Sequence, residues 1–219
     1  MKPFLVTLCL VSIFMGQMCV AEACNKRDVV VITTNKPIEN QLIYKNMVYE
    51  IQDEFDLSNR TIVIPDGCTL RFSGGKFKNG IIDLQNTIIE SLEKCFERVV
   101  CKGALNGTAC AKWFKETDDN VLQNLFVISN KIELEPDVVY SQTSTIDLNG
   151  RKGLEIEGNG STIRLISRTT FQMKLIDCSS WTIRNLTFDG NQRVRMCIYG
   201  NNNNKGLMQN VCICNIKDV

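Results

Sequence analysis

Histidine is absent from the 219 residues of this sequence. This absence excludes Ser-His-Asp and Cys-His catalysis, zinc sites built on histidine, and acid–base chemistry by an imidazole. Any catalysis would fall to carboxylates, Arg, Lys or Tyr. The cofactor that suits such side chains is a hard cation, and calcium is the one we expect.

Excess charge and long apolar segments are also scarce. The formal net charge of +1 gives no reason to expect nucleic acid or an anionic membrane as a partner. The one long apolar run, from Phe4 to Met15, follows Lys2 and precedes the small residues of Ala21-Glu22-Ala23. This pattern predicts a signal peptide over residues 1–23. We therefore expect an exported protein, in the periplasm, on the outer surface or secreted, with no transmembrane segment.

Cys24 would be the first mature residue if cleavage follows Ala23, which is where a bacterial lipoprotein carries its lipid. Cys9 and Cys19 of the eleven cysteines lie in the predicted signal peptide. Lipidation of Cys24 would then leave eight, an even number that suits disulfides in an oxidising compartment. Ala21 departs from the leucine usual in a lipid attachment motif, so a lipid anchor and a free exported protein both stay open.

Three of the remaining cysteines, Cys95, Cys101 and Cys110, are close enough in sequence to form a disulfide. Connectivity does not follow from sequence. The alternative is that several cysteines serve as small buried hydrophobic residues.

The stretch from Leu154 to Asp189 nearly repeats itself. Thr162-Ile163-Arg164 returns twenty positions later as Thr182-Ile183-Arg184, and Glu155-Ile156-Glu157 has the same offset to Leu175-Ile176-Asp177. Each piece alternates apolar and polar residues as a short strand does. Two strands per repeat at this period predict a solenoid in which each repeat stacks on the last.

Further short strands extend the pattern over the whole chain. Arg184 to Asp189 aligns with Gln209 to Cys214 at an offset of twenty-five, which adds another rung. In the N-terminal half, four closely spaced strands are interrupted by turn residues; they are Thr61–Ile64, Thr69–Phe72, Ile81–Leu84 and Thr87–Ile89. The predicted fold is all-β, a single-stranded right-handed parallel β-helix with one short capping α-helix.

Several motifs resemble known β-helix proteins. The residues Tyr49–Leu57, Ile64–Phe72 and Gly74–Gly80 look like the N-terminal segment of exported β-helix proteins of gut Bacteroidetes. Trp113-Phe114 and the following Thr117–Asn120 are similar to the start of the β-helix of the pectate-lyase superfamily.

The resemblance covers residues 48–215 and implies two segments after the signal peptide. Residues 24–112 would form the N-terminal β segment, the first coils of the solenoid. Residues 113–219 would form the pectate-lyase-like β-helix. This architecture hosts lyases, hydrolases, epimerases and non-catalytic proteins, so the resemblance indicates the fold more closely than the reaction.

The predicted helix follows a pair of acidic residues, Asp118 and Asp119. Either side chain can cap the first turn, because a carboxylate accepts hydrogen bonds from free backbone N–H groups and opposes the positive end of the helix dipole. We expect the amphipathic helix to cover an unpaired strand at one end of the stack. An acidic catalytic dyad is the alternative role for the pair.

The offset of twenty residues places Glu157 beside Asp177, and Arg164 beside Arg184, on neighbouring coils about 4.8 Å apart. Like charges directly opposite each other destabilise a sheet. We therefore predict calcium between Glu157 and Asp177, and an anionic sugar bound by Arg164 and Arg184. Asp177 and Arg184 are then candidates for catalysis by proton abstraction. The alternatives are alternating salt bridges across the turn, or four solvated surface charges.

A second cluster lies on a loop that leaves a strand. Asp189 and Arg193 are candidates for catalysis, and Arg195 is a candidate for substrate binding, because loops on a rigid scaffold commonly carry binding residues. The alternative is an ordinary polar turn. Asn185 and Asn210, aligned at twenty-five residues, are predicted to form an internal asparagine ladder with a structural role.

The sequence stops at Val219 in the middle of the strand rhythm, so we expect a chain truncated at its C-terminal end. An open last coil would then allow self-association with another chain. The predicted function is that of an exported protein acting on polysaccharide as a lyase or hydrolase. The alternative is a non-catalytic β-helix that binds glycans or serves as a surface structural module.

Overall fold

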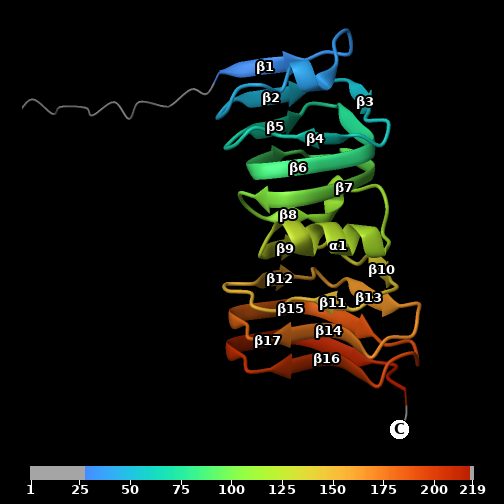
Figure 1. Ribbon diagram of the computed structural model, residues 1–219. Helices are drawn as coiled ribbons and strands as arrows, with labels where there is room; N and C mark the ends of the chain where they lie inside the picture. Colours follow the sequence, from blue (N-terminus) through green and yellow to red (C-terminus); the bar gives the residue numbers. More distant parts are fainter. Residues whose placement is uncertain (1–27, 218–219) are drawn as a thin grey trace, which may run out of the picture.

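The computed structural model describes residues 28–217. The chain forms a parallel β-solenoid of about eight turns with one α-helix, which confirms the predicted fold class (Figure 1). The predicted signal peptide and Cys24 lie outside the described residues.

Seventeen strands form the turns of the solenoid. Eight come before the helix: β1 (Val29–Ile32), β2 (Val48–Ile51), β3 (Glu54–Asp56), β4 (Thr61–Val63), β5 (Thr69–Phe72), β6 (Lys76–Glu90), β7 (Phe96–Leu105) and β8 (Ala109–Cys110). Nine come after it: β9 (Lys131–Glu133), β10 (Val139–Gln142), β11 (Ile146–Asp147), β12 (Glu155–Glu157), β13 (Thr162–Leu165), β14 (Phe171–Ile176), β15 (Ser179–Asp189), β16 (Met196–Asn201) and β17 (Asn204–Cys214). The helices are α1 (Asp119–Ile128) and the short 3-10 helices η1 (Ile38–Asn40) and η2 (Ala111–Trp113).

The C-terminal turns have three faces. Face 1 contains β9, β12 and the first parts of β15 and β17; face 2 contains β10, β13 and the last parts of β15 and β17; face 3 contains β11, β14 and β16. All of these pairs are parallel. Arg184 lies opposite Gln209 and Asp189 lies opposite Cys214, so the predicted offset of twenty-five residues is confirmed.

The offset of twenty residues is wrong. Ile163 pairs with Phe188, whereas Ile183 pairs with Ile156. The two copies of Thr-Ile-Arg therefore lie on different faces, the first on face 2 and the second on face 1. The sequence match arose because both faces need the same alternation of polar and apolar residues, so a motif from one face resembles a motif from another.

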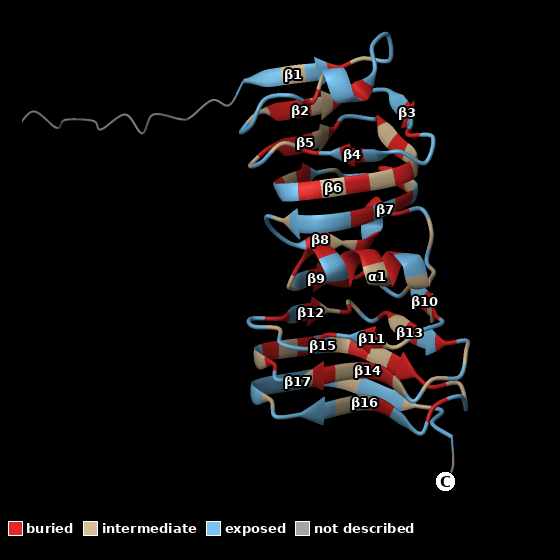
Figure 2. Cartoon of the chain, viewed as in Figure 1, coloured by how far each residue is buried: buried red, intermediate tan, exposed pale blue. Residues whose placement is uncertain are grey.

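One continuous core runs through the stack (Figure 2). Ile156 and Ile183, which are opposite each other, are 2% and 0% exposed, while their neighbours in sequence point outward. In the N-terminal turns the core also holds aromatic rings. Phe72 and Phe96 meet edge to face with centroids 5.5 Å apart, a favourable geometry for aromatic pairs.

The helix α1 covers strand edges, as expected, but within the stack instead of across one end (Figure 1). It follows β7 in space and contacts β7, β10 and β11. Its Asn124 is 5% exposed. The side-chain amide of Asn124 makes the hydrogen bonds to the edge of β7 that a neighbouring strand would otherwise make. Asn124 Oδ1 accepts from the backbone N–H of Cys101 at 3.0 Å, and Asn124 Nδ2 donates to the carbonyl of Val99 at 3.0 Å. Buried backbone groups that would otherwise lack partners are thus satisfied.

Corners between faces are made by single residues with positive φ, many of them asparagine. Asn185 (φ 51°) and Asn210 (φ 53°) occupy one corner on successive turns, and Asn210 Nδ2 donates to Asn185 Oδ1 at 3.0 Å. The two asparagines therefore do pair on successive turns, but the ladder lies at the surface and joins side chains, so the prediction of an internal ladder is wrong. Asparagine suits this position because it tolerates the left-handed conformation better than most residues.

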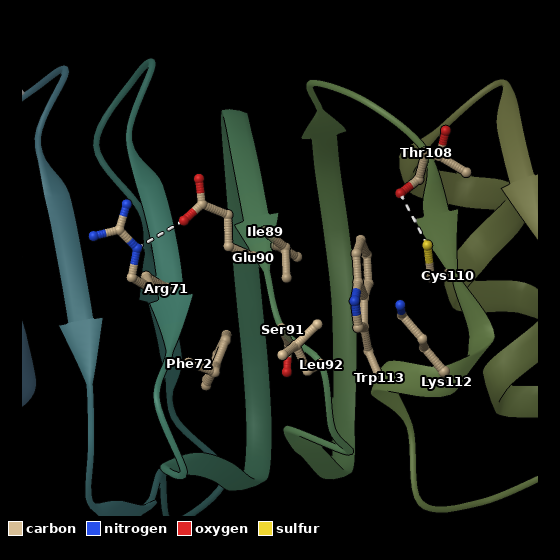
Figure 3. Close-up of a pocket in the computed structure, with 10 residues that line it drawn as sticks. All are labelled: Arg71, Phe72, Ile89, Glu90, Ser91, Leu92, Thr108, Cys110, Lys112 and Trp113. Atoms are coloured by element: carbon tan, nitrogen blue, oxygen red, sulfur yellow. Dashed lines mark hydrogen bonds and ion pairs between the residues drawn. The ribbon is translucent and has the colours of Figure 1, made fainter.

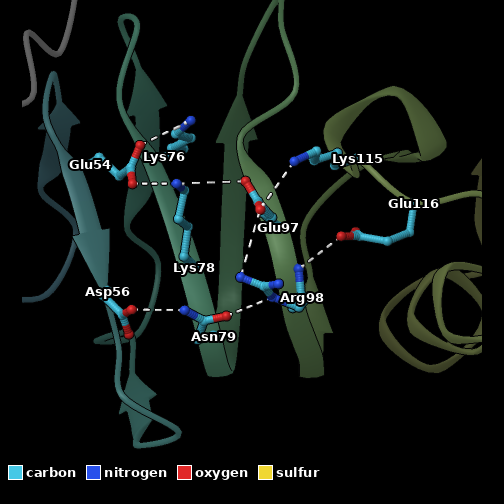
Figure 4. A network of polar contacts seen from close by, with 9 residues as sticks. All are labelled: Glu54, Asp56, Lys76, Lys78, Asn79, Glu97, Arg98, Lys115 and Glu116. Carbon is cyan, nitrogen blue, oxygen red and sulfur yellow. Dashed lines mark hydrogen bonds and ion pairs between the residues drawn. The ribbon is translucent and has the colours of Figure 1, made fainter.

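A second corner combines such a ladder with charge (Figure 4). Asn79 donates to Asp56 at 2.7 Å and accepts from Arg98 at 2.7 Å. Beside it, Lys78 forms ion pairs with Glu54 and, at 3.7 Å, with Glu97. The hydrogen bond from Lys78 lowers the pKa of Glu54. Opposite charges on successive turns therefore reinforce this part of the stack.

All eight cysteines among the described residues are free. Cys95 and Cys101 are buried in the core, and burial raises the pKa of Cys95 to about 12. The alternative prediction, that several cysteines are small buried hydrophobic residues, is confirmed. Cys110, the third cysteine considered for a disulfide, is also free.

The last turn leaves large apolar side chains exposed. Leu207, Met208 and Ile213 are 48%, 42% and 48% exposed. Self-association through this turn stays a prediction. Among the described residues, no helix has the length and apolar character needed to span a membrane.

Candidate functional site

A polar cavity of about 210 Å³ lies on face 1, where β9, β12 and β15 run side by side. We call it the face-1 cavity. It is lined by alternating outward residues of these strands, because inward residues such as Ile156 fill the core. Its polar lining residues are Thr108, Lys131, Glu133, Glu155, Glu157, Thr182 and Arg184.

The strand register arranges these side chains in two rows. Glu133, Glu157 and Arg184 are directly opposite one another on successive strands, and Lys131, Glu155 and Thr182 form the row beside them. Successive members of a row are therefore about 4.8 Å apart at the backbone. The cavity presents acceptors and donors in a regular array.

Three charged side chains in this array have no ion pair or hydrogen bond within the described part of the chain: Lys131, Glu155 and Arg184. Glu157 is half-buried and accepts from Asn185 Nδ2 at 2.8 Å and from the backbone N–H of Asn159 at 3.1 Å. The Glu157 carboxylate is thus held in place while its charged neighbours are free to bind a ligand.

A larger cavity of about 480 Å³ adjoins the first and shares Thr108 with it (Figure 3). We call it the Trp113 cavity. Its floor is apolar, with Phe72, Ile89 and Trp113 each less than 10% exposed. Arg71 and Glu90 form an ion pair of 2.7 Å on its far side. The two cavities adjoin at Thr108 on successive turns, and we call them together the groove.

Cys110 lies where the two cavities meet, and Figure 3 shows its thiol beside Thr108. Burial, followed by the nearby Glu133 carboxylate, raises the pKa of Cys110 to about 11. The thiol donates to Glu133 Oε2 at 3.6 Å. The raised pKa disfavours the thiolate of Cys110, which is the reactive form of cysteine.

The structure separates the pair of carboxylates predicted to hold calcium. The residue opposite Glu157 on the neighbouring strand is Arg184, and Asp177 lies seven residues earlier in the sequence. Asp177 instead occupies a corner (φ 55°), where it accepts from Asn202 Nδ2 at 2.5 Å. Within the described residues, no group of three or more Asp, Glu, Cys or His side chains could hold a metal ion. The residues at this place therefore do not fit the expected calcium ion.

The predicted stack of Arg164 on Arg184 is also wrong. Arg164 lies opposite Asp189 on face 2 and donates from Nε to Asp189 Oδ2 at 2.8 Å. Asp189 is 4% exposed and also accepts from Asn215 at 2.9 Å. Burial is the largest influence on the pKa of Asp189 and raises it, but these hydrogen bonds outweigh it and the pKa falls below the usual value. The pair holds two turns together, which suits a structural role.

Arg193 and Arg195 lie together on the turn before β16 and line a cavity other than the two described above. Asp189 does not line that cavity. The structure therefore does not unite the three residues of the predicted loop cluster.

The acidic pair ahead of the helix has the expected structural role. Asp118 accepts from the backbone N–H groups of Asn120 and Val121, as an N-cap does. Asp119 begins α1 and accepts from Thr143 and Ser144 at 2.8 and 2.9 Å. Both carboxylates thus fix the helix to its surroundings.

Sequence reasoning missed Lys131, Glu133 and Glu155. A signal for them was present, because Lys131-Ile132-Glu133 and Glu155-Ile156-Glu157 share the charged–Ile–charged pattern and the structure places them side by side. The pattern is short, so it could be recognised only with the correct turn length.

Comparisons with known proteins do not identify a family. No protein-family model matches this chain, and neither a curated protein nor a solved structure matches it. The resemblance to the pectate-lyase superfamily stays a prediction, since a solenoid topology is shared by many unrelated functions.

Proposed function

We propose that this chain is an exported polysaccharide-binding β-solenoid whose ligand lies in the groove on face 1. The observation that carries the proposal is the array of unpaired charged side chains, Lys131, Glu155 and Arg184, on three successive strands of one open cavity.

A polysaccharide suits this groove because it is an extended polymer with hydroxyl groups at regular intervals. Glu155 accepts hydrogen bonds from hydroxyls, Arg184 and Lys131 donate to hydroxyl or carboxylate oxygens, and Thr182 does both. The adjoining Trp113 cavity adds apolar surface against which the carbon-bound hydrogens of a sugar ring can pack. The groove offers successive strands to successive sugars.

Hydrolysis of the bound glycan is the second candidate function. The face-1 cavity brings three carboxylates together, Glu133, Glu155 and Glu157. Glycoside hydrolysis uses two carboxyl groups, either about 5–5.5 Å or about 6.5–9.5 Å apart. Adjacent strands separate Glu133 from Glu157 by about 4.8 Å at the backbone, and Glu155 and Glu157 are separated by about twice the rise of 3.3 Å per residue. Both spacings are within reach of such a pair.

Affinity electrophoresis or calorimetry with neutral and acidic polysaccharides tests binding. We expect Arg184→Ala and Glu155→Gln each to weaken binding by about one to two orders of magnitude, because a hydrogen bond to a charged group contributes about 1.5–3 kcal/mol. Lys45→Ala and Asp53→Gln are matched controls, since both side chains are exposed and lie in the N-terminal turns away from the groove. No binding to any polysaccharide, or equal loss in the controls, would contradict the proposal.

Catalysis is tested on the same samples by release of reducing ends and by the ultraviolet absorbance of unsaturated products. Hydrolysis predicts new reducing ends that disappear in Glu157→Gln, without unsaturated products. Unsaturated products would instead indicate a lyase. Binding without either product would assign the chain to the non-catalytic alternative.

A further inference from the structure

A third cavity, of about 320 Å³, lies at the turns that precede β14 and β16. We call it the basic cavity. The side chains that define it are Arg168, Thr169, Phe171, Arg193, Arg195 and Lys217. Among the described residues, none that lines the basic cavity is acidic.

The cations come from successive turns of the solenoid. Phe171 lies opposite Met196, and Arg168 and Arg193 each precede these residues by three positions. The same register therefore stacks the turn that carries Arg168 on the turn that carries Arg193. The backbone N–H of Lys217 donates to the carbonyl of Val194 at 2.8 Å, which adds a cation from the next level.

Stacked like charges are unfavourable unless something neutralises them. Elsewhere in this protein the problem is solved with ion pairs, as in Arg164–Asp189 and Lys174–Asp147. Within the described residues, the side chains of Arg168, Arg193, Arg195 and Lys217 have no ion pair and no hydrogen bond. The basic cavity thus gathers four positive charges with no counter-ion among residues 28–217.

Two further features point to a ligand. Thr169 Oγ1 is buried and has no hydrogen-bond partner, which is costly for a hydroxyl group. Phe171 stacks on Tyr199 with ring centroids 4.6 Å apart, so one wall of the cavity is a fixed aromatic surface. A ligand with an anionic group for the cations and Thr169, and a ring to lie near Phe171, would complement both features.

We propose that the basic cavity binds an oxyanion carried by a sugar ring: a sulfate ester, a phosphate ester or a uronic acid carboxylate. Arginine guanidinium groups donate paired hydrogen bonds to the oxygens of all three. Lys217 adds a point charge, and the Thr169 hydroxyl donates the hydrogen bond that it lacks in the free protein.

The basic cavity is independent of the face-1 cavity. None of its lining residues lines the other cavity. Binding of an anionic sugar here does not rest on the proposed function, and loss of one activity need not affect the other.

Calorimetry at low ionic strength, on the purified protein, tests the proposal with glucose 6-sulfate, glucose 6-phosphate and glucuronic acid. Glucose and inorganic sulfate and phosphate separate the contributions of ring and anion. We expect at least one anionic sugar to bind, more tightly than its free anion or glucose, and added salt to weaken the binding. The sugar that binds most tightly identifies which oxyanion the site prefers.

Two sets of variants locate the binding. Arg193→Ala with Arg195→Ala should weaken it at least tenfold, and Thr169→Val, which keeps shape and charge, should weaken it about tenfold. The matched control is Lys36→Ala with Lys45→Ala, which removes two exposed lysines in the N-terminal turns. Arg184→Ala should leave the binding unchanged, although it weakens polysaccharide binding on face 1.

A readout on the unaltered protein avoids dependence on folding of the variants. Ring resonances of Phe171 and Tyr199 should shift on titration with the sugar that binds. The proposal is overturned if none of the three anionic sugars binds, if the lysine control loses as much affinity as the arginine variant, or if the Phe171 and Tyr199 resonances stay in place at saturation.

Discussion

Replacement of Asn124 by leucine removes the side chain by which the helix α1 takes the place of a strand. Asn124 makes two hydrogen bonds of 3.0 Å to β7 and is 5% exposed. Leucine has a similar shape but no polar atoms. The Asn124→Leu variant would therefore leave the Cys101 N–H and the Val99 carbonyl buried without partners.

The cost follows from these two groups. Each buried backbone group left unsatisfied costs about 1–3 kcal/mol. Burial of the leucine methyl groups returns about 1–2 kcal/mol, which is part of the gain for a fully buried leucine. The two groups together cost about 2–6 kcal/mol, so we expect the free energy of unfolding to fall by about 1–4 kcal/mol.

Urea unfolding measures this loss, with the midpoint and the slope compared between variant and unaltered protein. Val127→Ala is the control, because Val127 is on the same helix and 51% exposed; its effect should stay within about 0.5 kcal/mol. Hydrogen exchange at the Cys101 amide should accelerate in Asn124→Leu alone. A loss below about 1 kcal/mol, or unchanged exchange at Cys101, would refute the role assigned to Asn124.

Three further perturbations test other parts of the fold. Asn185→Ala should lower the free energy of unfolding by about 2–3 kcal/mol, because alanine is disfavoured by about 1–2 kcal/mol at positive φ and the hydrogen bonds of the ladder are lost. Asn185→Gly should lower it less, because glycine adopts positive φ freely. Equal losses for the two variants in urea unfolding would contradict this. The pKa of Asp189 is lowered in the folded protein, so the contribution of this carboxylate to the free energy of unfolding is complete above the unfolded-state pKa of about 3.9. That contribution disappears as the pH falls through the lower folded-state pKa. Asp189→Asn should therefore flatten the acid limb of the pH–stability curve, and an unchanged limb would contradict this. A thiol reagent should label the exposed Cys212 in the folded protein and leave Cys95, with its pKa of about 12, unlabelled until unfolding; rapid labelling of Cys95 would show that the core is open.

The fold could be predicted because its rules are local. Alternation of inward and outward residues identified short strands such as Thr69–Phe72, and the Asp118 cap identified the start of the helix. The ladder of Asn185 and Asn210 followed from an offset of twenty-five residues, since one corner position recurs with the same residue on both turns.

Two features could not be predicted for physical reasons. Turns of this solenoid differ in length: Ile156 reaches Ile183 after twenty-seven residues, whereas Ile163 reaches Phe188 after twenty-five. A fixed period therefore placed Glu157 beside Asp177. The location of the helix depends on long-range contacts, such as those of Asn124 with β7, that leave no periodic signal in the sequence.

The basic cavity also depends on the lengths of the turns, which the sequence pattern did not reveal. Arg193 and Arg195 were recognised as candidates from their loop, but Arg168 and Lys217 join them only through stacking of turns. Knowledge of the twenty-five-residue offset on faces 2 and 3 would have brought Arg168 to Arg193. The cluster of four cations therefore depends on the offset between Phe171 and Met196.

The order of strands on face 1 underlies both the groove and its charged array, and paired cysteines measure it directly. Directly opposite residues on neighbouring strands are about 4.8 Å apart at the backbone, within the 4.4–6.8 Å that a disulfide spans. In a protein with Cys212 and Cys214 changed to serine, Glu157→Cys with Arg184→Cys should form a disulfide on mild oxidation, whereas Glu157→Cys with Asp177→Cys should not. A disulfide in the second pair and none in the first would contradict the register and remove the basis for the groove.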